Sequence, residues 1–84
     1  VRILLVEDDE MIGQSLQKAL KSHVVNWVKD TFAAEQTLNL ETYDLISLDL
    51  GLPKRSGLEY LVQLRKKGIM IPVLIITARD SIQD

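Results

Sequence analysis

Three runs of consecutive apolar residues constrain the fold of this chain more than any other feature. They cover residues 3–6, 45–48 and 73–76, and only Ser47 interrupts them. Strands that are covered on both faces have this composition, whereas a strand with one face in water alternates apolar and polar residues. We therefore expect buried strands at residues 2–6, 44–49 and 73–77.

The segments between these strands carry helical signals. Apolar residues at positions 12, 16, 19 and 20 predict a helix from residue 10 to about residue 22, with Asp9 as its N-cap. A second helix is expected to begin at residue 30 or 31 and to end near residue 40. A third begins at the capping box of Ser56 and Glu59 and ends in a basic turn before Gly68.

A short β-rich segment at residues 24–28 completes a β-α-β-α-β-α-β order, and residues 80–81 look like the start of a further helix. Strands that alternate with helices imply right-handed crossovers and a parallel sheet with helices on both faces. The predicted fold class is therefore α/β, a doubly wound parallel sheet in three layers. A chain of 84 residues is long enough for one domain.

Composition excludes several classes of protein. The formal net charge of −2 predicts no general attraction to nucleic acids or membranes. The chain has no cysteine, which excludes a disulfide framework and a thiolate metal site. No apolar stretch approaches the roughly 20 residues that a membrane span needs. We expect a cytoplasmic protein with no membrane partner.

Polar residues at the ends of the strands predict one site. Glu7 and Asp8 follow the first strand, Asp49 ends the third, and Thr77 ends the fourth. In such sheets, ligands bind at the carboxyl ends of the strands. Neighbouring carboxylates repel one another unless a cation neutralises them. Oxygen ligands without His or Cys favour Mg²⁺ or a similar hard ion, and a backbone carbonyl in the Gly51 region could add another oxygen.

Such a site suits phosphoryl chemistry. A cation held by few protein oxygens has open positions for a phosphoryl oxygen, and a carboxylate beside it can act as the nucleophile that forms an acyl phosphate. Asp49 is the best candidate, because it is the acid in the middle of the sheet. Thr77 could donate a hydrogen bond to a phosphoryl oxygen, and Ala78 leaves room beside it.

Each of these residues has a plainer interpretation when it is taken alone. The acidic run at residues 7–10 is more often a solvated turn and an acidic helix start. Asp49 could simply end a strand, and Thr77 could be a β-branched strand residue. Trp27 is interpreted as a packing residue and His23 as a surface residue. At the ends of three parallel strands, however, chance is the weaker explanation for the acids and the threonine together.

At these residues the chain resembles the receiver (CheY-like) domain of a two-component response regulator. It is most similar to receivers of the OmpR/PhoB subgroup of winged-helix transcription factors. The resemblance covers all 84 residues, and the matching motifs are residues 2–9, 43–53, 56–57 and 72–79. It implies the flavodoxin-like (CheY-like) fold with strand order 2-1-3-4 and the fifth strand missing.

The resemblance also implies roles for the acidic residues. Asp49 would be the phosphoacceptor. Asp8 would bind Mg²⁺ directly, together with Asp49 and the Gly51 carbonyl, and Glu7 would act through water. The phosphodonor would be a sensor histidine kinase. The output would be control of transcription through a separate DNA-binding domain, which this chain does not contain.

Other parts of the family's machinery match in part. Thr77 would be the switch residue that contacts the phosphoryl group, with Ala78 beside it. The family's lysine and switch aromatic on the fifth strand have no counterpart here, so we expect residues 1–84 to be the N-terminal part of one receiver domain. Phosphorylation is then expected to be slow and its switching readout lost. The strand at 73–77 would be an exposed edge through which chains associate or exchange elements.

Three hypotheses follow from the sequence. The main one is a signalling module that accepts a phosphoryl group and is not an enzyme, apart from a slow self-dephosphorylation. The second is a phosphatase with an aspartate nucleophile. Such an enzyme would need a second acid two residues after Asp49, where this chain has Gly51, which argues against it. The third is an inactive receiver fragment that acts only as a self-association module.

Overall fold

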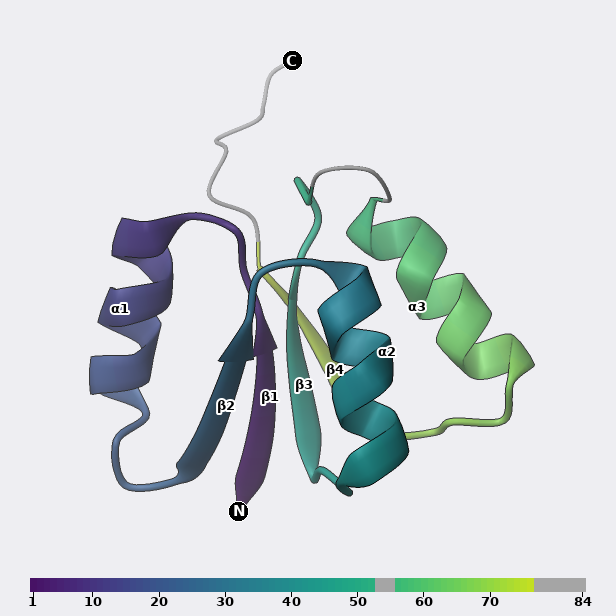
Figure 1. Cartoon of the computed structure of the whole chain (residues 1–84), viewed down its shortest axis with the longest axis horizontal. Helices are drawn as coiled ribbons and strands as arrows, with labels where there is room; N and C mark the ends of the chain where they lie inside the picture. The colour runs from purple at the N-terminus through teal and green to yellow at the C-terminus, as the bar shows by residue number, and fades with distance from the viewer. Residues whose placement is uncertain (53–55, 77–84) are drawn as a thin grey trace.

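The computed structural model describes residues 1–52 and 56–76 (Figure 1). Strands and helices alternate along the chain, as the sequence predicts. The strands are β1 (Arg2–Val6), β2 (Val24–Val28), β3 (Leu45–Asp49) and β4 (Val73–Ile76). The helices are α1 (Glu10–Ala19), α2 (Thr31–Leu40) and α3 (Gly57–Lys66). The expected helix at residues 80–81 and the last residue of the fourth strand, Thr77, lie outside the described residues.

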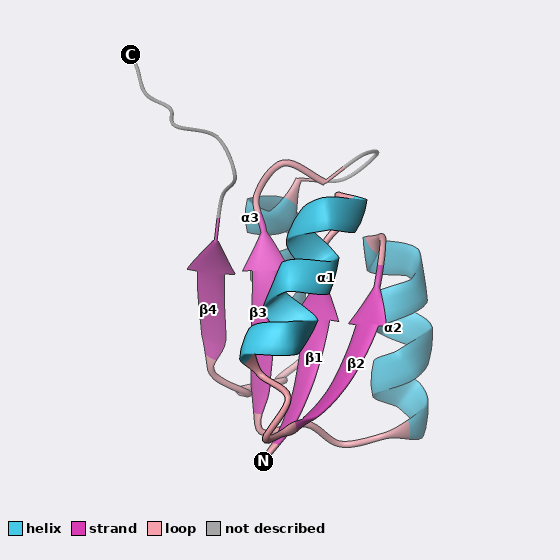
Figure 2. Ribbon diagram, turned by 90° about the vertical axis from the view of Figure 1, so that its left-hand side faces the viewer, coloured by secondary structure: helices cyan, strands magenta, loops and turns pink. Residues whose placement is uncertain are grey.

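The four strands form one parallel sheet in the order β2-β1-β3-β4. Figure 2 shows α1 on one face of this sheet and α2 and α3 on the other. This is the doubly wound, three-layer arrangement that the alternating pattern predicts. Because all strands run in the same direction, their carboxyl ends meet at one edge, which is where the acidic residues were expected.

The main core lies between the sheet and the pair α2 and α3. Alternate residues of the two central strands face it, so Leu4 pairs with Ile46 and Val6 with Leu48 in the register of β1 and β3. All four side chains are fully buried. Ile3 and Leu5 point to the other face and are buried as well. Burial on both faces explains why these strands are apolar without alternation.

The predicted helix caps are confirmed. The Asp9 side chain accepts a hydrogen bond from the Ile12 N–H (2.9 Å) and caps α1. Ser56 and Glu59 form the reciprocal capping box of α3. Gly68 follows α3 with a φ of 83°, a conformation that favours glycine at the end of a helix.

Two predicted boundaries differ from the structure. Helix α1 ends at Ala19 and not near residue 22, because the chain turns there: the His23 N–H donates to the Leu20 carbonyl (2.9 Å). Strand β3 begins at Leu45, one residue later than expected. Asp44 instead uses its carboxylate to accept a hydrogen bond from the Arg2 N–H (2.8 Å).

Candidate functional site

Three carboxylates come together where β1 and β3 end. Glu7 follows β1, Asp8 comes next in the loop to α1, and Asp49 is the last residue of β3. Each offers a carboxylate oxygen, and these oxygens all lie within 4.8 Å of one another. Glu7 (1% exposed) and Asp49 (6% exposed) are buried, whereas Asp8 is exposed to solvent. The sequence prediction that these acids share one edge of the sheet is confirmed.

Hydrogen bonds fix both the backbone and the side chain of Glu7. Its N–H donates to the Val28 carbonyl of β2 (3.0 Å), and its carboxylate accepts a hydrogen bond from the Asp9 N–H (3.1 Å). Burial raises the pKa of Glu7 to about 7, the Asp9 N–H opposes this shift, and the negative charge of Asp49 adds to it. Without a cation, this carboxyl group therefore carries a proton for part of the time at neutral pH.

Asp49 is positioned by the loop that follows it. One of its carboxylate oxygens accepts a hydrogen bond from the Gly51 N–H (3.1 Å). Gly57, at the start of α3, lies against the Asp49 backbone: a Cβ atom there would be only 2.4 Å from the Asp49 carbonyl oxygen. The Gly57 N–H donates to the Leu50 carbonyl (3.3 Å). A glycine at this position therefore lets the helix approach the end of β3 closely.

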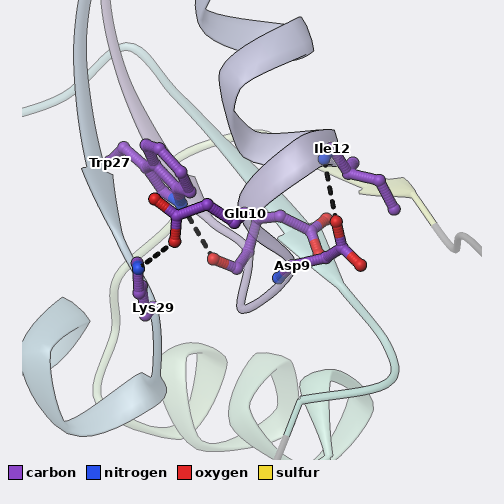
Figure 3. Close-up of polar contacts among 6 residues, drawn as sticks. Asp9, Glu10, Ile12, Trp27 and Lys29 are labelled. Atoms are coloured by element: carbon purple, nitrogen blue, oxygen red, sulfur yellow. Dashed lines mark hydrogen bonds and ion pairs between the residues drawn. The ribbon is translucent and has the colours of Figure 1, made fainter.

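Asp9 has a different structural role from Glu7 and Asp8. Its side chain caps α1 (Figure 3), and it is not a member of the carboxylate cluster found among residues 1–52 and 56–76. Glu7 and Asp8, and not Asp9, therefore share the carboxylate cluster with Asp49. The direct role of the Gly51 carbonyl stays a prediction. Thr77 and Ala78 lie outside the described residues.

The three carboxylates fit a hard divalent cation. Their oxygens are the ligands that Mg²⁺ prefers, and the chain has no cysteine that would favour a softer metal. A cation would also remove the repulsion between Glu7 and Asp49 and the cost of charging Glu7 in a buried position. The cluster is therefore compatible with a metal site.

Comparison with known proteins identifies the family. The family model of the response regulator receiver domain matches residues 3–84. This chain belongs to the response regulator receiver family. The response regulator protein PmrA of Pseudomonas aeruginosa is 46% identical to this receiver over 86 residues. That alignment covers 100% of the receiver and 39% of PmrA, so the chain spans well under half the length of this relative.

Solved receivers have the same fold. The receiver domain of the Francisella response regulator 1452 superimposes with a TM-score of 0.87 at 30% identity, covering 95% of this chain and 68% of that one. The MaeR response regulator bound to beryllium trifluoride gives a TM-score of 0.88 at 26% identity, with 96% of this chain and 70% of that one covered. The flavodoxin-like (CheY-like) fold and the order 2-1-3-4 are thus confirmed.

Within the part of this receiver that the structure describes, no helix is long and apolar enough to cross a membrane.

Two contacts near these elements are not predicted by the sequence. The sequence predicts only a packing role for Trp27, but its indole N–H donates to the Glu7 carbonyl (2.8 Å). Arg65 belongs to the predicted basic end of the third helix, and its guanidinium also donates to the carbonyls of Ile69 (2.8 Å) and Ile71 (2.9 Å), which orders the segment before β4. No local sequence pattern signals either contact, because both depend on how distant segments pack.

Proposed function

We propose that this chain is a phospho-accepting receiver, in which Asp49 takes a phosphoryl group from a sensor histidine kinase in a Mg²⁺-dependent reaction. The observation that carries the proposal is the carboxylate cluster, with Asp49 at the end of a central strand and Glu7 and Asp8 within 4.8 Å. Asp8, Asp49 and the Gly51 carbonyl would bind the ion directly, and Glu7 would act through water.

The proposed step is a displacement at phosphorus. A lone pair of the Asp49 carboxylate forms the new O–P bond, and the N–P bond of the kinase phosphohistidine breaks. The electron pair of that bond goes to the imidazole nitrogen. The Gly51 N–H holds one Asp49 oxygen, which leaves the other oxygen for the attack. Bound Mg²⁺ would neutralise charge on the transferring phosphoryl group.

Several features of the relatives support this proposal. MaeR was solved with beryllium trifluoride, a small anion that resembles a phosphoryl group. Relatives such as the transcriptional regulatory protein BasR of Escherichia coli support an output in transcription, through a DNA-binding domain outside these 84 residues.

Thr77 and Ala78 would contact the phosphoryl group. The chain would act in the cytoplasm as a signalling module and not as an enzyme.

The test is the intact mass after incubation with Mg²⁺ and a small phosphodonor. The wild-type chain should gain one phosphoryl group and Asp49→Asn none. Asp44→Asn is the matched control, because Asp44 lies at the opposite end of β3 and bonds the Arg2 N–H. An adduct on Asp49→Asn, or none on the wild type, would contradict the proposal. Steady turnover of a phosphomonoester would favour the phosphatase hypothesis instead.

A specific observation favours a second candidate function, self-association. Strand β4 lies at the edge of the sheet, with β3 on one side and no other strand beside it among the described residues. Its Leu74 and Ile75 side chains are 52% and 40% exposed. An exposed apolar edge strand pairs readily with another chain. We propose that two copies associate through the strand at residues 73–77, or exchange elements there.

A further inference from the structure

The only tryptophan of the chain lies directly behind the carboxylate cluster. Trp27 belongs to β2 and pairs with Leu5 of β1, so its side chain points to the face of the sheet that α1 covers. Its indole N–H donates a hydrogen bond to the carbonyl oxygen of Glu7 (2.8 Å); this is the dashed line that leaves the ring of Trp27 in Figure 3. This carbonyl belongs to the peptide group that joins Glu7 to Asp8.

Strand β2 thereby holds both backbone polar groups of Glu7. The Glu7 N–H donates to the Val28 carbonyl (3.0 Å), and the Glu7 carbonyl accepts from Trp27. Val6 and Val28 are the last paired residues of β1 and β2, so the indole extends the hydrogen bonding by one peptide group beyond the ladder. Fixing this peptide plane restricts the directions in which the Glu7 and Asp8 side chains can leave the backbone.

The indole itself is held in place by α1. Gly13 faces the ring so closely that a Cβ atom at that position would lie 2.0 Å from the ring carbon Cζ2. Lys29 follows directly after β2; its ammonium lies 5.4 Å from the ring centroid and forms an ion pair with Glu10 in the first turn of α1 (Figure 3). The ring therefore cannot turn without moving either the helix or this ion pair.

We infer that Trp27 is a positioning residue for the cation site: its indole N–H orients the Glu7–Asp8 peptide so that both carboxylates face Asp49. The inference rests on the proposed function, because it assigns a purpose to the orientation of a metal-binding loop. Partners that orient metal ligands change metal affinity by about 10- to 100-fold when they are removed. Because Trp27 acts through the backbone, we expect the lower end of this range, about tenfold.

The test compares Mg²⁺ affinity by titration calorimetry in the intact protein and in two variants. Trp27→Phe keeps an aromatic ring against Gly13 but removes the indole donor. Tyr43→Phe is the matched control: it removes another aromatic hydrogen bond to β2, from the Tyr43 hydroxyl to Asn26 (2.6 Å), away from the carboxylates. Trp27→Phe should bind Mg²⁺ about tenfold more weakly, and Tyr43→Phe should bind it like the wild type.

The outcomes separate this inference from the proposed function. A wild type that binds no Mg²⁺ would contradict the proposed function, and the inference with it. A wild type that binds Mg²⁺ no better than Trp27→Phe does would overturn the inference alone. Equal weakening in Tyr43→Phe would overturn it too, since the effect would then follow from a general loss of stability.

A measurement on the wild type avoids any problem with folding of the variants. The single tryptophan gives one indole N–H signal in a proton–nitrogen NMR spectrum, and its hydrogen bond ends on the metal-binding loop. This signal should shift on addition of Mg²⁺ in the wild type and stay in place in Asp8→Asn. An indole signal that does not move while Mg²⁺ binds to the wild type would overturn the inference.

Discussion

Glu7 and Asp8 are neighbours in sequence, but their surroundings differ. Glu7 lies beneath the surface with its pKa raised to about 7, whereas Asp8 is exposed to solvent. A cation arriving from solvent would therefore meet Asp8 first. Its charge would then favour the ionised form of Glu7, which burial and the charge of Asp49 disfavour in its absence. The two acids can thus serve one site in different ways.

The raised pKa of Glu7 predicts how stability depends on pH when no metal is present. The ordinary value near 4.5 applies in the unfolded chain, and the value of about 7 applies in the folded chain. Between these values the folded state binds more protons, so its free energy of unfolding falls as pH rises from about 4.5 to about 7. Across this pH range, Glu7 lowers the free energy of unfolding by at most about 3 kcal/mol.

Urea unfolding at several pH values checks this prediction against Glu7→Gln, which cannot titrate at that position. The stability difference between wild type and variant should move in favour of the variant as pH rises through this window. Mg²⁺ should reverse the trend in the wild type, because the bound cation stabilises the charged carboxylate. A difference between the two proteins that is independent of pH would contradict the account.

The roles of Asp8 and Asp9 can be separated by matched substitutions. Asp8→Asn should weaken Mg²⁺ binding by about tenfold or more and leave stability nearly unchanged, because Asp8 is exposed and offers a ligand oxygen. Asp9→Asn should leave Mg²⁺ affinity unchanged, because Asn also caps helices well. Calorimetry on both variants checks this. A larger loss of affinity in Asp9→Asn would mean that the metal ligands are assigned to the wrong acids.

At the scale of elements, α3 depends on a glycine at its first residue. In an exposed helix, replacing Gly by Ala normally stabilises by about 0.5–1 kcal/mol. Here the added Cβ would meet the Asp49 carbonyl oxygen at 2.4 Å, so Gly57→Ala should instead destabilise by about 1–3 kcal/mol. Chemical denaturation measures the sign directly. A stabilising Gly57→Ala would show that α3 does not pack against the end of β3 as described.

The elements were predictable where their signals are local. Asp9 and the pair Ser56 and Glu59 mark helix starts, because a cap needs only a side chain and the next few backbone N–H groups. The end of α1 was misplaced, since it is decided by the turn between Leu20 and His23 that brings the chain back to β2. Apolar periodicity cannot show where such a turn begins.

The carboxylates of the site were predictable for a topological reason. Parallel strands bring their carboxyl ends to one edge, so the acids that follow β1 and end β3 had to lie near each other once the sheet order was inferred. The Trp27 hydrogen bond was not predictable in this way. It requires the register of β2 against β1 and the gap left by Gly13, and both arise only in the folded molecule.

At the scale of the whole molecule, strand β4 has no outer neighbour among the described residues, which predicts that copies of this chain associate. Leu74→Lys places a charge on the exposed strand and should raise the dissociation constant of the self-associated form by roughly tenfold or more. Leu58→Lys is the matched control, because Leu58 is similarly exposed but belongs to helix α3 and not to the edge strand. Sedimentation velocity should show an associated wild type that Leu74→Lys disperses and Leu58→Lys does not. A monomeric wild type would contradict the prediction.

The proposed function depends on Asp49 being the residue that carries the phosphoryl group. The most direct measurement is to treat the intact protein with Mg²⁺ and a small phosphodonor, reduce the acyl phosphate with borohydride, and map the modified peptide by mass spectrometry. Reduction converts a phosphorylated aspartate to homoserine, so the account predicts homoserine at position 49 alone. Homoserine at position 8 or 9, or a phosphoryl group on a hydroxyl side chain, would contradict it.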